Sequence, residues 1–186
     1  MSDPAHVEGT AISLDGLADD VESLMQIYNR TTAAPKLEDY CVQIDTLCGG
    51  QKYSLKQADV RRMESAYNLC RKAEEYFPEI EIYCRGSDVT HWLLKAAKYR
   101  SDYDARLKYA LASYEYDTAI LNAWLKKAGG EPGGVKGVMP DFNMIANLAD
   151  DETDISYICL VSGDKTMADM YYEMAEVKRK YMVQMH

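Results

Sequence analysis

Imidazole titrates near neutral pH, so histidines are the first candidates for acid–base chemistry or metal binding. The chain has three, and two of them, His6 and His186, stand close to its ends. His91 stands beside Trp92 near the start of a long helical pattern. No Glu-x-x-His pair of the kind used by di-iron bundles occurs in the sequence. We therefore predict that His91 is a surface or interface residue and not a catalytic base or ligand.

The cysteines and glycines form no recognisable catalytic or cofactor motif. The five Cys, at positions 41, 48, 70, 84 and 159, are odd in number and include no Cys-x-x-Cys pair, which is atypical of a zinc site or a disulfide framework. Lys136 in the glycine-rich segment is followed by Gly137 and not by the Ser or Thr of a phosphate loop. Nucleophile-elbow and dinucleotide-binding motifs are also absent from the sequence. The sequence thus predicts a non-enzymatic protein with no catalytic residue, no cofactor and no metal ligand.

Carboxylates are grouped in acidic runs, of which Asp150-Asp151-Glu152 is an example. Acidic residues are favoured in the first turn of a helix because they face the positive end of its dipole. We interpret this run as the solvated start of the last helical segment, which begins near Asp151–Thr153.

A segment in which basic residues alternate with tyrosines, between positions 95 and 109, is an alternative binding site. Rings for stacking and cations for phosphates are the combination that holds single-stranded nucleic acid. The formal net charge of −9 opposes general binding to duplexes. On a helical projection, most of these cations also lie opposite the apolar stripe that contains the tyrosines. Nucleic-acid binding is kept as an alternative, with a patch of Lys95, Lys98, Arg106 and Lys108.

Residues 87–128 form the longest helical pattern of the chain. Apolar side chains recur three and four positions apart, and the pattern contains neither Gly nor Pro. Residues 107–125 are apolar on almost all sides, which is typical of a helix buried on two faces or lying at a subunit contact. Arg100 lies inside the apolar stripe with Asp104 one turn later. This allows either one continuous helix with an Arg–Asp pair or a break near Ser101, and we favour the continuous helix.

Shorter helical patterns account for most of the remaining sequence. Residues 1–12 lack periodicity and are expected to form a flexible arm, and residues 129–140 form a loop rich in Gly and Pro. The alternating stretch 79–84 has no partner strand and is interpreted as a short helix or a connector. Gly163 is a candidate break in the last segment, with Asp164 as the cap of a final helix. The expected helices cover about 14–29, 36–48, 54–77, 87–128, 141–149 and 153–184.

The predicted fold class follows from these patterns. It is a single all-α domain over residues 13–186, an elongated helical bundle of five or six helices built around the long central helix. The C-terminal segment adds a Met- and Tyr-rich stripe at heptad spacing. Such a stripe is core in most helices, and it is also suited to adaptable partner contacts. Its residues are Met167, Met170, Met174, Val177 and Tyr181.

Protein–protein interaction or assembly through Tyr-, Trp- and Met-rich helix faces is the function that these patterns favour, with another protein or a second copy as the partner. The alternatives are the nucleic-acid patch and a ligand-binding or enzymatic bundle with a Tyr-lined pocket near Arg100. The N-terminus lacks a secretory pattern and the sequence lacks a membrane-spanning run, so we expect a cytoplasmic protein that does not bind membranes. The candidate interaction residues are Arg100, Asp104, Tyr109, Tyr116, Ile120, Trp124, Met170 and Met174.

Overall fold

Helices make up nearly all of the chain that the structure, a computed structural model, describes. The described residues are 34–49, 56–127 and 142–184. The helices are α2 (Leu37–Cys48), α3 (Gln57–Glu74), α4 (Ile80–Arg100), α5 (Tyr103–Lys127), α6 (Phe142–Val161) and α7 (Lys165–Gln184). All of them belong to the unit Lys36–His186, and no strand occurs among the described residues. The predicted all-α fold is confirmed. The predicted arm 1–12, helix 14–29 and loop 129–140 lie outside the described residues.

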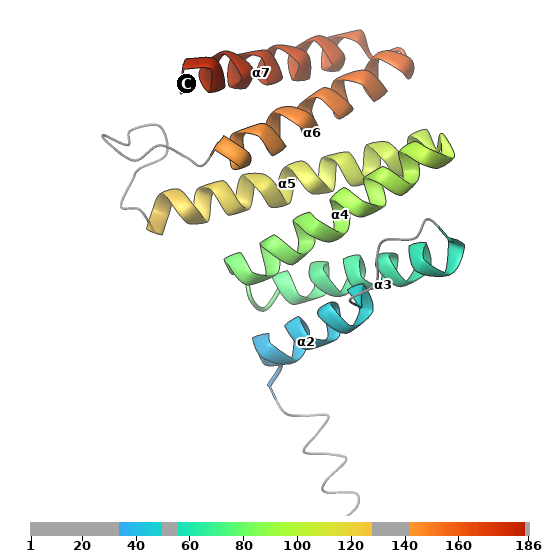
Figure 1. Ribbon diagram of the computed structural model, residues 1–186, viewed down its shortest axis with the longest axis vertical. Helices are drawn as coiled ribbons and strands as arrows, with labels where there is room; N and C mark the ends of the chain where they lie inside the picture. Colours follow the sequence, from blue (N-terminus) through green and yellow to red (C-terminus); the bar gives the residue numbers. More distant parts are fainter. Residues whose placement is uncertain (1–33, 50–55, 128–141, 185–186) are drawn as a thin grey trace, which may run out of the picture. The chain divides into compact units, whose positions relative to one another are not determined.

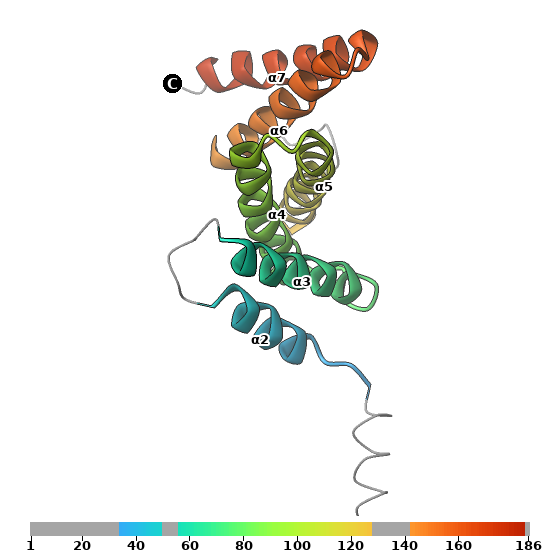
Figure 2. The same cartoon turned by 90° about the vertical axis from the view of Figure 1, so that its right-hand side faces the viewer.

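Packing follows the order of the chain, because each described helix lies against the next one (Figure 1). α2 also contacts α4, and α4 and α5 lie side by side in both views (Figure 2). Most of the core lies between α2, α3, α4 and α5, with contributions from α6 and α7. None of the described helices combines the length and apolarity needed to cross a bilayer. Fully buried apolar residues of this core include Ile44, Ala66, Ile82, Leu93, Ala110, Tyr116 and Ile155.

The single helix predicted over residues 87–128 is wrong, because a turn at Ser101 divides it into α4 and α5. Ser101 adopts the left-handed conformation, with φ 55°. The amide of Ser101 donates to the carbonyl of Lys98 at 3.2 Å, and the amide of Asp102 donates to the carbonyl of Ala97 at 3.1 Å. These two bonds form a Schellman motif. The Asp102 carboxylate then accepts a hydrogen bond from the amide of Ala105, as an N-cap does. Capping chemistry thus supplies the break without Gly or Pro.

Ser101 is the one described non-glycine residue with positive φ, which gives a first testable prediction. The left-handed conformation costs a residue with a Cβ about 1 kcal/mol relative to glycine. We expect Ser101→Gly to raise the free energy of unfolding by about 0.5 to 1 kcal/mol, measured by urea denaturation. Ser65→Gly is the control, because Ser65 is exposed inside α3 and should lose about the same amount. A loss of stability in Ser101→Gly would contradict the assignment.

The C-terminal half is also divided differently from the predicted helices 141–149 and 153–184. Thr153 does not begin a helix, because its hydroxyl donates to the carbonyl of Ala149 inside α6 at 2.6 Å. The break falls at Gly163, whose φ is +85°, and Asp164 accepts a hydrogen bond from the amide of Met167. The predicted junction at Gly163 and Asp164 is therefore confirmed, and the one near residue 150 is wrong.

The ends of two other helices differ from the predicted ones. α3 spans Gln57–Glu74, which is shorter at both ends than the predicted helix 54–77. The alternating stretch 79–84 belongs to the start of α4, with Glu79 as the N-cap residue and Ile80 as the first residue of the helix. Gly86 lies inside that helix and is buried against the ring of Tyr116. It therefore serves close packing and does not mark the end of an element.

Candidate functional site

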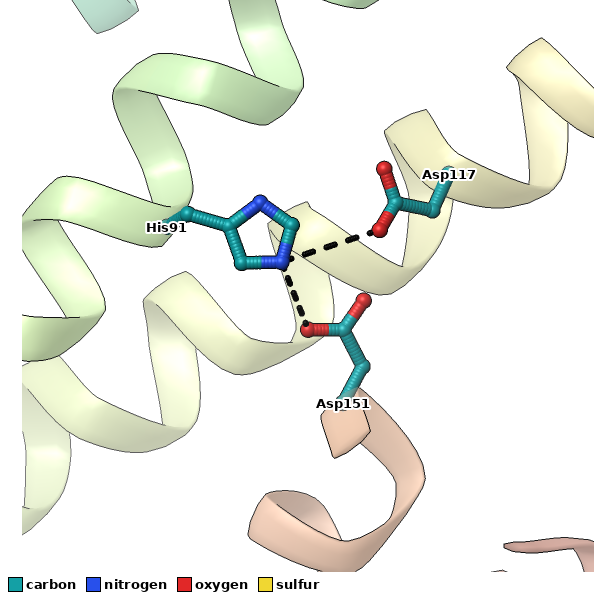
Figure 3. Close-up of side chains that lie close together, drawn as sticks. All are labelled: His91, Asp117 and Asp151. Carbon is teal, nitrogen blue, oxygen red and sulfur yellow. Dashed lines mark ion pairs between the residues drawn. The ribbon is translucent and has the colours of Figure 1, made fainter. Parts of the chain in front are cut away.

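Three side chains with metal-binding or acid–base chemistry meet where α4, α5 and α6 come together (Figure 3). His91 Nε2 lies 3.7 Å from Asp117 Oδ2 and 3.6 Å from Asp151 Oδ1. One ligand atom from each of the three residues falls within 4.8 Å of the other two. We call these three residues the His91 cluster. Asp151 and Glu152 are both buried within α6. The interpretation of the acidic run at 150–152 as a solvated helix start is therefore wrong.

Helical spacing places two serines beside the cluster. Ser87 precedes His91 by one turn of α4, and Ser113 precedes Asp117 by one turn of α5, so each pair shares a helix face. Ser87 Oγ donates to Asp117 Oδ1 at 2.5 Å. Ser113 Oγ lies 3.2 Å from His91 Nε2. The two helix faces are thereby joined by polar contacts through an otherwise apolar packing layer.

Hydrogen bonds fix the orientation of the imidazole. His91 Nδ1 lies 3.1 Å from the carbonyl oxygen of Ser87 and 3.2 Å from its hydroxyl oxygen. Because a carbonyl oxygen only accepts, this contact assigns a proton to Nδ1. Nε2 then faces the two carboxylates. The side chain of His91 is about one-third exposed, so this edge of the cluster is open to solvent.

The two carboxylates are buried, with Asp117 4% and Asp151 1% exposed. Burial raises the pKa of Asp117 above its ordinary value, against the hydrogen bond from Ser87. Burial and the neighbouring charge of Asp117 raise the pKa of Asp151 to about 9. Oδ2 of each accepts no hydrogen bond from another described side chain, but the two carboxyl groups are hydrogen-bond partners, with the proton held by Asp151 donated to Asp117. Ionised carboxylates in this position are costly unless a cation joins them.

Cavities lead from the surface to the cluster. One of about 260 Å³ is bordered by His91 and Asp151 together with Lys95, Asn147 and Asp150. A second, of about 340 Å³, is bordered by His91, Trp92 and Asn147. A third, of about 170 Å³, reaches Ser87 and Asp117. Water and small ions therefore have direct access to the cluster.

The predicted interaction residues do not form one surface. Tyr109 and Tyr116 are buried and belong to the core of this chain, while Ile120 and Trp124 are partly buried on α5. The apolar side chains that surround residues 107–125 therefore serve internal packing at Tyr109 and Tyr116 and are partly exposed at Ile120 and Trp124. Arg100 and Asp104 are exposed on either side of the turn at Ser101. Met170 is exposed and Met174 partly buried on α7.

The predicted nucleic-acid patch is largely occupied by contacts within the chain. Lys98 and Arg106 both form ion pairs with Asp154, and the Arg106 guanidinium also lies 4.5 Å from the ring centroid of Tyr157. The Lys108 ammonium lies 5.0 Å from the ring centroid of Tyr109. Lys95 is exposed at the edge of the cavities described above. Three of the four cations of the patch therefore already contact side chains of this chain, which disfavours binding of a phosphate backbone.

The predicted Tyr-lined pocket near Arg100 is small. The cavity beside this residue measures about 40 Å³ and includes Tyr109 in its wall. Ligand pockets usually occupy about 300 to 1,000 Å³. The geometry around Arg100 therefore gives no support to the ligand-binding alternative.

The heptad stripe of the C-terminal segment lies on the surface of α7. Met167, Met170, Val177 and Tyr181 are exposed, and Met174 is partly buried. We call these five residues the α7 stripe. The buried residues of α7 are two alanines, Ala168 and Ala175.

No protein-family model, curated protein or solved structure matches this chain. Its function therefore has to be inferred from its own geometry.

Proposed function

We propose that this protein is a non-enzymatic assembly protein that pairs with a second copy of itself through the α7 stripe. The observation that supports the proposal is the exposure of four of the five stripe residues along α7, with Met174 partly buried. Apolar side chains at heptad spacing normally face a partner helix. Contiguous exposed apolar surface of this kind marks interaction sites in soluble proteins.

The contact between α6 and α7 leaves most of the α7 stripe uncovered. Among the described helices, α7 packs along α6 alone, apart from the ring of Tyr171, which meets the ring of Tyr114 on α5. That packing uses Ala168 and Ala175, which lie about a third of a turn away from the stripe. Small residues let the two helices approach closely. The larger Met, Val and Tyr side chains are then left on a neighbouring face.

The charges beside the stripe favour an antiparallel pair of identical helices. Glu173 and Lys180 are exposed on the same edge of the stripe, two helical turns apart. In an antiparallel pair with twofold symmetry, Glu173 of each copy faces Lys180 of the other, which forms two equivalent ion pairs. A parallel pair would instead bring Glu173 towards Lys178, which already pairs with Glu152. We therefore propose an isologous, antiparallel α7 contact.

Sedimentation or light scattering over a range of protein concentrations tests the proposal. We expect a concentration-dependent dimer, which Val177→Glu should weaken at least tenfold by placing a charge in the apolar contact. Val183→Glu is the matched control, because Val183 lies on another face of α7. The two valines are similarly exposed, at 66% and 76%, so neither substitution should disturb the fold. A monomer at high concentration, or equal effects of the two substitutions, would overturn the proposal.

Charge reversal tests the antiparallel orientation in the same assay. Glu173→Lys alone and Lys180→Glu alone each place like charges opposite one another at two positions. We expect each to weaken the dimer by about 1 to 2 kcal/mol, or roughly five- to thirtyfold. The double variant Glu173→Lys/Lys180→Glu restores both pairs and should recover the affinity. A double variant that dimerises no better than the single ones would contradict the antiparallel arrangement.

A further inference from the structure

We propose that the His91 cluster binds one divalent transition-metal ion, with His91 Nε2, Asp117 Oδ2 and Asp151 Oδ1 as its protein ligands. This site is separate from the α7 stripe and does not depend on the proposed assembly. It also departs from the sequence-based expectation of no metal ligand, since that expectation rested on motif spacing along single helices.

The spacing of the three atoms suits a metal ion. Bonds from zinc to imidazole nitrogen or carboxylate oxygen are about 2.0 to 2.2 Å long, so neighbouring ligand atoms lie roughly 3 to 3.6 Å apart. The distances from His91 Nε2 to Asp117 Oδ2 and Asp151 Oδ1 are 3.7 and 3.6 Å. All three atoms lie within 4.8 Å of one another, so side-chain rotations that draw the two carboxylates together would complete the coordination. Each ligand comes from a different helix (Figure 3), so the helix packing itself sets this spacing.

The buried charge provides a second, independent observation. Asp117 and Asp151 are more than nine-tenths buried, and among the described residues Oδ2 of each has no hydrogen-bond donor other than the neighbouring carboxyl group. Both carboxylates lie within 3.7 Å of His91 Nε2, whereas Lys98 and Arg106 pair with Asp154 and Lys178 pairs with Glu152. Buried charges in proteins are normally paired or coordinated to metal ions. A divalent cation would displace the proton shared by the two carboxyl groups and balance the charge of both carboxylates.

The surrounding hydrogen bonds match those that orient metal ligands. A ligating histidine usually donates its other ring N–H to a carbonyl or carboxylate, which fixes the tautomer and the ring orientation. His91 Nδ1 does so to the Ser87 carbonyl oxygen at 3.1 Å. The second oxygen of Asp117 is held by the Ser87 hydroxyl at 2.5 Å. Ser87 thus positions two of the three ligands.

The donor set indicates the class of metal. One imidazole and two carboxylates suit Zn²⁺, Mn²⁺, Fe²⁺ or Co²⁺, whereas Mg²⁺ and Ca²⁺ prefer sites made of oxygen alone. Three protein ligands leave at least one coordination position for water or for a small anionic ligand. The cavity of about 260 Å³ beside His91 and Asp151 gives room for it.

Calorimetric titration of the full chain, first freed of metal with a chelator, tests the site with Zn²⁺, Mn²⁺ and Mg²⁺ as probes. We expect one Zn²⁺ or Mn²⁺ per chain, weaker binding of Mg²⁺, and a higher melting temperature in the presence of the bound ion. His91→Ala and Asp151→Asn should each weaken binding more than tenfold and abolish the thermal shift. Ser87→Ala should weaken binding about ten- to a hundredfold, as expected for a positioning residue.

Asp150→Asn is the matched control, because Asp150 is exposed beside the same cavity and should leave the affinity nearly unchanged. The variant His6→Gln/His186→Gln removes the other imidazoles and should keep the binding. Co²⁺ bound at the cluster should give no thiolate charge-transfer band, which separates this site from the free cysteines. Circular dichroism tests whether Asp151→Asn is folded. If it is not folded, Asp117→Asn takes its place. Absence of Zn²⁺ and Mn²⁺ binding at millimolar concentration, or equal binding by His91→Ala and Asp150→Asn, would overturn the proposal.

Discussion

Gly86→Ala is expected to lower the free energy of unfolding by about 2 kcal/mol. A Cβ at this position would lie 2.4 Å from Cε1 and Cζ of Tyr116, well inside van der Waals contact. Tyr116 is 1% exposed, so its ring has no free space into which to move. Alanine improves helix propensity by about 1 kcal/mol over glycine, but overpacking a core costs about 1 to 3 kcal/mol or more. We expect crowding to outweigh propensity at such short distances, with a fall in melting temperature of roughly 4 to 8 °C.

A double-mutant cycle separates crowding from backbone effects. In a Tyr116→Leu background the ring is gone, so Gly86→Ala should cost little or even stabilise the helix. Urea denaturation of the four proteins gives the coupling energy directly. If Gly86→Ala stabilised the otherwise unchanged protein, the close approach of α4 to the Tyr116 ring would be disproved.

The helical fold could be predicted because periodicity and capping are local properties. α2 spans Leu37–Cys48, close to the predicted 36–48, and it ends at Gly49 in the left-handed conformation. The break between α4 and α5 also depends only on neighbouring residues. It occurs at Ser101, which adopts a left-handed conformation that usually requires Gly, so the sequence does not reveal it. Asp102 provides the N-terminal cap of α5. The absence of Gly and Pro is therefore not sufficient to predict a continuous helix, because Ser101 and Asp102 end one helix and begin the next.

The His91 cluster could be predicted only in part. The pairs Ser87–His91 and Ser113–Asp117 are four residues apart, so their shared helix faces were visible in the sequence. Asp117 also stood as a charged residue inside a segment interpreted as apolar on nearly all sides. The contribution of Asp151 was not visible, because it depends on α6 continuing through residue 150 and packing beside α5. Long-range packing, which periodicity does not encode, brings the third ligand to the other two.

On α7, the most hydrophobic face of the helix is not the face that packs against α6. Met, Val and Tyr at heptad spacing gave the more apolar face of the C-terminal segment, and core packing was the default interpretation. The face that α7 buries contains Ala168 and Ala175 instead. Small side chains allow α6 and α7 to approach closely, and this advantage of shape does not appear in a scale of hydrophobicity.

Lys178→Met is expected to produce the other large loss of stability, about 2 to 3 kcal/mol at neutral pH. Lys178 on α7 pairs with Glu152 on α6, whose side chain is fully buried. The second oxygen of Glu152, Oε2, accepts no hydrogen bond from the described residues. Removing one partner of a buried ion pair costs about 3 to 5 kcal/mol because the other charge is left uncompensated. We reduce this figure because Lys178 is itself partly exposed.

The loss of stability in Lys178→Met is expected to increase with pH. Burial raises the pKa of Glu152 above its ordinary value of 4.5, and the charge and hydrogen bond of Lys178 oppose that shift. Without Lys178, the folded protein binds the Glu152 proton still more strongly than the unfolded chain does. Stability of Lys178→Met should therefore fall as the pH rises above about 4.5, relative to the parent protein, and the difference should shrink at lower pH. Urea denaturation at several pH values measures it.

Two further variants distinguish the loss of the ion pair from a general loss of packing at α7. Lys126→Met changes an exposed lysine at the end of α5 and should leave stability within about 0.5 kcal/mol of the parent protein. Glu152→Gln/Lys178→Met removes both charges and keeps the size of the buried side chain, so it should recover most of the stability lost by Lys178→Met. If this double variant were as unstable as Lys178→Met at neutral pH, the apolar contacts of the lysine stem would be the cause. In that case the attachment of α7 to α6 would depend on packing around Ala168 and Ala175 and not on the buried carboxylate.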